Sequence, residues 1–141
     1  MKKIVLSAIA LIVTGTLISF KLPTTKTSEV VAFQDGNKGK AIYNKTCVAC
    51  HQANGQGIPN AFPPLAKSDY LKRAPKDLIS VILKGQSGEI KVNGVVYNGM
   101  MPAQDYLSDE EIADVLNYIN NSWGNKNLKP ILPSQVKLLR P

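Results

Sequence analysis

The chain has very few of the side chains that most often bind transition metals. Its 141 residues include only two cysteines and one histidine. Two cysteines cannot build a fold held by several disulfide bonds. Together with the histidine they give three ligands, one fewer than a structural zinc site needs. The chain also has no internal repeat and no low-complexity tract. Its length therefore predicts one globular domain plus a short additional segment.

Positive charge exceeds negative charge only moderately over most of the chain. The formal net charge is +7, but from Phe33 onward thirteen Lys and Arg residues stand against nine Asp and Glu residues. No arginine-rich cluster with interleaved aromatic residues is present, so the composition does not favour nucleic-acid binding. A mildly basic body is typical of a domain that docks on acidic protein surfaces.

The N-terminus has the pattern of an export segment. Lys2 and Lys3 precede an apolar run, residues 4–20, that contains no charge. This pattern predicts that residues 1–21 are a signal peptide or an N-terminal membrane anchor, and it leaves both open. We expect a linker over 22–34, the domain over 35–124, and a C-terminal tail packed on the domain over 125–141. Export predicts a periplasmic protein, soluble or tethered to the inner membrane through residues 4–20.

Both cysteines and the histidine fall within residues 47–51, Cys-Val-Ala-Cys-His. This spacing predicts covalent attachment of a c-type haem. On a helix, positions three and four apart share a face, so Cys47, Cys50 and His51 would project together. The two thiols can form thioethers with the haem vinyl groups while the imidazole reaches the iron. A redox dithiol or a simple disulfide remains an alternative, but either would leave His51 unexplained.

The segment after this motif, residues 52–67, is rich in Gly, Pro and Asn and predicts a loop. A backbone carbonyl at Pro63 or Pro64 could accept the Nδ1 proton of His51. Such a bond would orient the imidazole and raise its basicity towards iron. Leu65, in the same loop, is expected to pack on the haem.

An iron atom bound by His51 needs a sixth ligand, a water molecule or an open position. There is no second histidine, and apart from the initiator the only methionines are Met100 and Met101. We favour Met101 because it directly precedes Pro102. Histidine and methionine ligation raises the reduction potential of haem iron. The other methionine is expected to be a packing residue.

Sequence periodicity elsewhere predicts a mainly helical domain. A first helix is expected from Asp35 into the haem motif, where Gly39 marks either a close helix crossing or a tolerated surface glycine. A second helix should begin at Pro75 and end at Gly85. The Asn-Gly pair within residues 90–97 predicts a hairpin.

The last predicted helix covers residues 108–122. Ser108 and Glu111 have the spacing of a capping box, and an apolar stripe follows it. The tail beyond contains three prolines, and we expect an extended path with one helical turn near residues 134–139.

With these motifs placed, residues 35–124 resemble a class I c-type cytochrome with a single haem. The resemblance rests on residues 47–51, 63–65, 97–102 and 107–112. It extends to bacterial cytochrome c domains found alone or fused to nitrite reductases, oxidases and quinoprotein dehydrogenases. It implies an all-α cytochrome c fold with helices packed around one covalent haem, plus a small β-hairpin, and a crossing of the first and last helices beside the haem.

The same resemblance implies site residues and a function. Cys47 and Cys50 would be the thioether sites, His51 the proximal ligand and Met101 the distal ligand. The protein would be a one-electron carrier rather than an enzyme, working between exported or membrane-bound partners of a respiratory chain. Those partners would include an oxidase, a nitrite reductase or a quinoprotein dehydrogenase. A haem enzyme or sensor with an open iron position, and a permanent subunit of a larger enzyme, are the alternatives.

Overall fold

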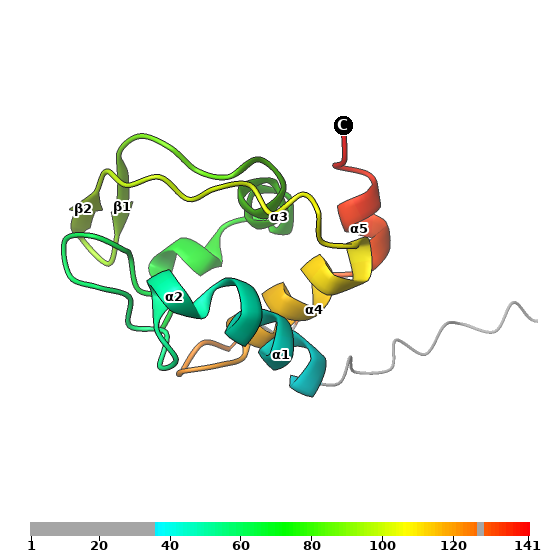
Figure 1. The fold of residues 1–141 in the computed structure, drawn as a ribbon, viewed down its shortest axis with the longest axis horizontal. Helices are drawn as coiled ribbons and strands as arrows, with labels where there is room; N and C mark the ends of the chain where they lie inside the picture. Colours follow the sequence, from blue (N-terminus) through cyan, green and yellow to red (C-terminus); the bar gives the residue numbers. More distant parts are fainter. Residues whose placement is uncertain (1–35, 127–128) are drawn as a thin grey trace, which may run out of the picture. The chain divides into compact units, whose positions relative to one another are not determined.

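The computed structural model describes residues 36–126 and 129–141 of the protein. The expected export segment (1–21), the linker (22–34) and the helix cap at Asp35 lie outside these residues. Within them, no helix is both long enough and apolar enough to cross a membrane. The elements, in chain order, are α1 (Gly36–Thr46), α2 (Val48–His51), the 3-10 helix η1 (Asp69–Lys72), α3 (Pro75–Lys84), β1 (Ile90–Val92), β2 (Val95–Tyr97), α4 (Asp109–Asn120) and α5 (Pro133–Lys137) (Figure 1).

Helices α1 and α4 cross in close contact at Gly39 (Figure 1). A Cβ atom at Gly39 would lie 2.2 Å from the carbonyl oxygen of Asp114 and 2.6 Å from Cβ of Tyr118. Both distances are far shorter than van der Waals contact, so the two backbones can approach only because residue 39 has no side chain. The close crossing, rather than a tolerated surface glycine, is the interpretation that the structure supports.

Helix α4 begins as the sequence predicts. The Ser108 hydroxyl accepts a hydrogen bond from the Glu111 N–H at 3.2 Å, and the Glu111 carboxylate accepts one from the Ser108 N–H at 2.9 Å. This pair satisfies two N–H groups that a helix start leaves free. The predicted stripe is also confirmed, because the buried residues of α4 include Ile112, Val115, Leu116 and Ile119.

The predicted end of this helix at residue 122 is wrong, since α4 ends at Asn120. The Ser122 hydroxyl donates to the Tyr118 carbonyl at 2.6 Å, and the Ser122 N–H bonds the Ile119 carbonyl rather than continuing the α-helical pattern. Trp123 and Gly124 then adopt positive φ angles of 50° and 85°. Short polar side chains that bond nearby carbonyls favour helix ends over helix interiors, which accounts for the earlier stop.

The first helix does not run unbroken into the haem motif, and that prediction is wrong. Helix α1 ends at Thr46, Cys47 lies between the helices, and α2 is a single turn. Cys47 and Val48 pack against the buried cluster of Tyr43, Val115 and Ile119, which turns the chain at this point. The Cys47 carbonyl still accepts the His51 N–H at 3.0 Å, so the motif keeps one helical turn.

The middle of the chain follows the prediction closely. Helix α3 begins at Pro75 and ends before Gly85, whose φ is 74°. Strands β1 and β2 pair antiparallel, with Asn93 and Gly94 at the turn in left-handed conformations of 49° and 85°. The turn is tied to η1, because Asp69 and Asn93 exchange two backbone-to-side-chain hydrogen bonds of 2.8 and 2.9 Å.

Residues 129–141 pack along α4 (Figure 1). The Asn117 side chain exchanges two hydrogen bonds of 2.8 Å with the backbone of Ile131. Ile131 and Val136 are fully buried in the main core. The helical turn expected near residues 134–139 is present as α5, which begins at Pro133.

Candidate functional site

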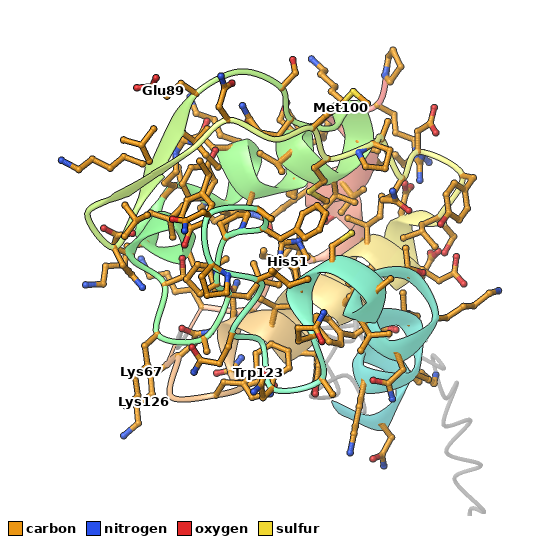
Figure 2. The ribbon with its side chains drawn as sticks, turned by 60° about the vertical axis from the view of Figure 1, so that its left-hand side comes forward. His51, Lys67, Glu89, Met100, Trp123 and Lys126 are labelled. Carbon is orange, nitrogen blue, oxygen red and sulfur yellow. The ribbon has the colours of Figure 1, made fainter. Side chains whose placement is uncertain are left out.

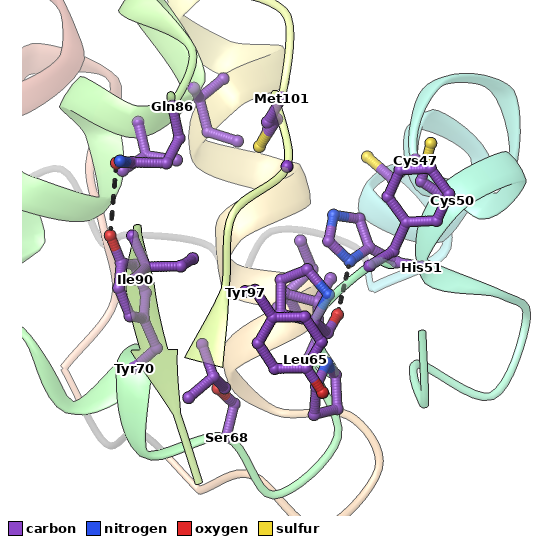
Figure 3. Close-up of a pocket in the computed structure, with 18 of the residues that line it drawn as sticks. Cys47, Cys50, His51, Leu65, Ser68, Tyr70, Gln86, Ile90, Tyr97 and Met101 are labelled. Atoms are coloured by element: carbon purple, nitrogen blue, oxygen red, sulfur yellow. Dashed lines mark hydrogen bonds between the residues drawn. The ribbon is translucent and has the colours of Figure 1, made fainter. Parts of the chain in front are cut away.

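The side chains of Cys47, Cys50 and His51 meet at one pocket (Figure 3). The break after α1 does not separate them. The pocket lies between α2, the loop that follows it, α3, the hairpin and α4. Its walls are largely apolar, and their larger side chains include Phe62, Leu65, Leu71, Ile82, Leu116 and Ile119.

The His51 ring is held by the loop that the sequence predicted. Its Nδ1 lies 3.0 Å from the carbonyl oxygen of Pro63, so Pro63 rather than Pro64 provides the acceptor. A carbonyl can only accept, which places the proton on Nδ1 and leaves Nε2 free as an acceptor or a metal ligand. Burial lowers the pKa of His51, although the bond to Pro63 opposes this in part. The imidazole is therefore neutral at pH 7, the form in which it binds metals.

Glycine at position 57 brings the Pro63 carbonyl into place. The Gly57 N–H donates to the His51 carbonyl at 3.0 Å, and its φ is +64°. A Cβ there would lie 2.2 Å from the Phe62 carbonyl oxygen. The loop therefore folds back tightly on the end of α2. This path places the Pro63 carbonyl next to the His51 imidazole, although the loop contains neither a helix nor a strand.

Tyr43 fixes the other side of the same turn. Its hydroxyl donates to the carbonyl of Gln52, the residue after His51, at 2.7 Å. The Tyr43 side chain is fully buried, and burial raises the pKa of its phenol well above the ordinary value. The hydroxyl therefore stays protonated and remains a donor. No local sequence pattern indicates this hydrogen bond, because it joins residues nine positions apart.

The two methionines differ sharply in burial. Met100 is 76% exposed, whereas Met101 is partly buried and packs against the main core. In Figure 3 the Met101 side chain lies across the pocket from the His51 ring. The Met101 backbone forms a two-way bridge with Gln86, through hydrogen bonds of 2.8 and 2.9 Å. Sequence reasoning missed Gln86, because a backbone bridge between residues fifteen positions apart has no local pattern.

The environment of the thiols argues against a redox dithiol. Both cysteines are free in the structure. Burial, and then the nearby Cys50, raise the pKa of the Cys47 thiol to about 11. Reactive Cys-x-x-Cys motifs have the opposite property, a lowered thiol pKa that supplies thiolate at neutral pH.

Comparison with known proteins agrees with this geometry. The family model for cytochrome c matches residues 36–123. Cytochrome c-552 of Thermus thermophilus is 47% identical over 110 residues, which cover 72% of this chain and 83% of that protein. The chain belongs to the cytochrome c family. It is therefore an electron-transfer protein that binds haem c covalently, and it is not itself an enzyme.

Further relatives are parts of larger enzymes. The cytochrome c subunit of the quinone-dependent alcohol dehydrogenase of Gluconobacter oxydans is 33% identical over 108 residues. The Cbb3-type cytochrome c oxidase subunit CcoP of Azospirillum brasilense is 31% identical over 96 residues. The matches cover 22% and 29% of those two proteins, so this cytochrome corresponds to one segment of each.

The pocket of this cytochrome suits a haem. Two thiols and a neutral imidazole open onto a largely apolar space that would exclude water from the ring. Ser68 adds a polar atom, since its buried Oγ has no hydrogen-bond partner among the described residues. This mixture fits a cofactor with an apolar ring and polar carboxylates. When bound, the haem supplies an iron that takes up and releases one electron.

Proposed function

We propose that this cytochrome is a one-electron carrier whose single haem is bound by thioethers at Cys47 and Cys50. In this proposal His51 and Met101 are the axial ligands. Pro63 orients His51 through its carbonyl, and Leu65 packs on the ring. An iron with both axial positions filled by protein has no site for substrate, which agrees with electron transfer and opposes the enzyme and sensor alternatives.

The difference between the two methionines is the observation that carries the ligand assignment. Met101 lines the pocket from the side opposite His51, with its backbone fixed by Gln86 (Figure 3). Met100 also borders the pocket but is 76% exposed, and its side chain lies at the periphery in Figure 2. A thioether fixed inside an apolar pocket is the better ligand because water does not compete for the iron there.

Absorption spectroscopy of the purified haem-loaded protein tests this assignment. The oxidised wild-type protein should show the weak far-red band of iron bound by methionine sulfur, and sharp α and β bands should appear on reduction. Met101→Ala should abolish the far-red band, and Met100→Ala should keep it. A high-spin wild-type spectrum, or loss of the band in Met100→Ala instead, would contradict the proposal.

We further propose that the protein works outside the cytoplasm. Residues 1–21 act as a signal peptide or an anchor, residues 22–34 as a linker, residues 35–124 as the cytochrome domain and residues 125–141 as its tail. The carrier then moves electrons between exported or membrane-bound partners of a respiratory chain. Fractionation of the producing cells and mass spectrometry of the mature N-terminus test this. A full-length chain in the cytoplasm would contradict it.

Two versions of this function differ in the partner: a free carrier moves between proteins, whereas a fixed subunit stays bound to one enzyme. The match covers 83% of the relative named cytochrome c-552, and this favours a free carrier. The dehydrogenase and oxidase relatives favour a fixed subunit instead. Size-exclusion chromatography of a native extract distinguishes them, since a free carrier elutes near the mass of one chain and a subunit elutes with its enzyme.

A further inference from the structure

A second cavity, of about 240 Å³, lies next to the haem pocket and differs from it in charge. Of the residues that the structure describes, Lys67, Lys72 and Lys126 line it, and no acidic residue does. Ser68 and Leu71 belong to both cavities, which therefore share a wall. A hollow lined by charges of one sign concentrates ions of the opposite sign.

The cavity also contains two buried polar side chains with unused hydrogen-bonding capacity. Ser68 is 3% exposed and Asn120 is 2% exposed. The Ser68 hydroxyl and both amide atoms of Asn120 have no partner among the described residues. Buried polar atoms nearly always have a partner, so this pair needs an explanation. A hydroxyl and an amide NH₂ can both donate to an oxygen anion.

The walls of the cavity are held in place by other residues. The Asn125 side chain accepts from the Ser68 N–H at 3.3 Å and donates to the carbonyls of Leu65 and Ile119 at 2.8 and 2.9 Å. This side chain joins the loop before η1 to the end of α4. The opening is therefore built into the fold rather than left by loosely packed surface chains.

Among the described residues, none forms an ion pair with Lys67, Lys72 or Lys126, so their ammonium groups remain available for a ligand. The aliphatic part of Lys67 lies along Gly124, where an added Cβ would be 3.0 Å from the lysine Cε. Figure 2 shows Lys67 and Lys126 extending from the same edge of the protein. Asp69 is the acidic residue next to Ser68 in sequence, but it is not part of the cavity and its carboxylate accepts from Asn93.

We propose that this basic cavity binds an oxyanion, a carboxylate or a phosphate. The three lysines neutralise its charge, and Ser68 and Asn120 donate hydrogen bonds to its oxygens. The anion has two sources, a carboxylate of the bound haem reaching past Ser68 or inorganic phosphate from solution. The proposal does not depend on the axial ligands, so its failure would leave the assignment of His51 and Met101 untouched.

A phosphate titration of the reduced, haem-loaded protein tests the solution source. Nuclear magnetic resonance at constant ionic strength follows the Asn120 side-chain amide and the Ser68 backbone amide. Saturable shifts of both signals are expected. Lys126→Gln removes one charged donor and should weaken binding about tenfold. The matched control is Lys38→Gln, an exposed lysine of α1 outside the cavity, which should leave binding unchanged.

The same sample tests the haem source. If a haem carboxylate occupies the cavity, phosphate causes no saturable shift. Magnetisation transfer then appears between the Asn120 amide protons and the methylene protons of the haem propionates. Lys126→Gln should in that case lower the reduction potential more than Lys38→Gln does. Absence of both signals, or equal phosphate shifts in the two lysine variants, would overturn the proposal.

Discussion

Gly39→Ala should destabilise the protein, although alanine is the better helix former. The new methyl group would enter the crossing of α1 and α4, 2.2 Å from the Asp114 carbonyl oxygen. Ordinary contact begins near 3.4 Å, so the helices must separate by about 1 Å or more. Neither contacting atom belongs to a flexible side-chain end, and the strain cannot be relieved by a rotamer change.

The magnitude follows from two opposing terms. Forcing a methyl group into a packed contact costs typically 1–3 kcal/mol, and a contact against backbone belongs near the upper limit, about 3 kcal/mol. Replacing glycine inside a helix returns about 0.5–1 kcal/mol. The net loss of unfolding free energy is then about 2 kcal/mol. For a domain of about 100 residues this lowers Tm by roughly 8–16 °C.

Gly36→Ala provides the matched control, because glycine 36 begins the same helix and an added Cβ meets nothing within 4 Å. Thermal unfolding of both haem-loaded variants, followed by circular dichroism, should show a fall in Tm for Gly39→Ala and none for Gly36→Ala. An unchanged or higher Tm in Gly39→Ala would refute the argument that close backbone approach requires glycine at this position.

Three further substitutions test the supports of the site and the fold. Gly57→Ala should lower the free energy of unfolding by about 1–3 kcal/mol more than Gly88→Ala. Both glycines have positive φ, but only an added Cβ at residue 57 meets a backbone oxygen, so only Gly57→Ala should perturb the haem spectrum. Tyr43→Phe should lose about 1 kcal/mol in urea unfolding, because the Gln52 carbonyl loses one of its two donors and keeps the Gly55 N–H; an unchanged midpoint would contradict the Tyr43 bond. Ser108→Ala should lose about 1 kcal/mol by the same assay, whereas Ser108→Thr, which can still cap, should lose much less.

Local patterns predicted those parts of the fold that depend on neighbouring residues. The capping box at Ser108, the proline start and glycine end of α3, and the Asn-Gly hairpin all lie where the sequence placed them. The sequence predictions were wrong where contacts between residues far apart in the chain determine the structure. The helix breaks at Cys47 because that segment packs on α4, and α4 stops at Asn120 because side chains beyond it bond its last carbonyls.

The same distinction applies to the site. A short motif identified the expected haem contacts, since Cys47, Cys50 and His51 follow one another within five residues. The sequence left Pro63 and Pro64 as the two candidates for the carbonyl that accepts from His51. The structure identifies Pro63 as the acceptor. The bridge from Gln86 to Met101 has no local sequence pattern, and neither has the lack of a hydrogen-bond partner for Asn120 among the described residues. Both depend on elements far apart in the chain.

The proposed iron ligands share one feature: each is held by contacts with the protein backbone. His51 is oriented by the Pro63 carbonyl, whose loop is closed by Gly57, and Met101 is fixed by its bridge to Gln86. Neither support carries a charge that changes with the iron's oxidation state. With both ligands fixed in a largely apolar pocket, little needs to move when an electron arrives or leaves. This rigidity suits an electron carrier, and an enzyme that must open an iron position for substrate would need the opposite.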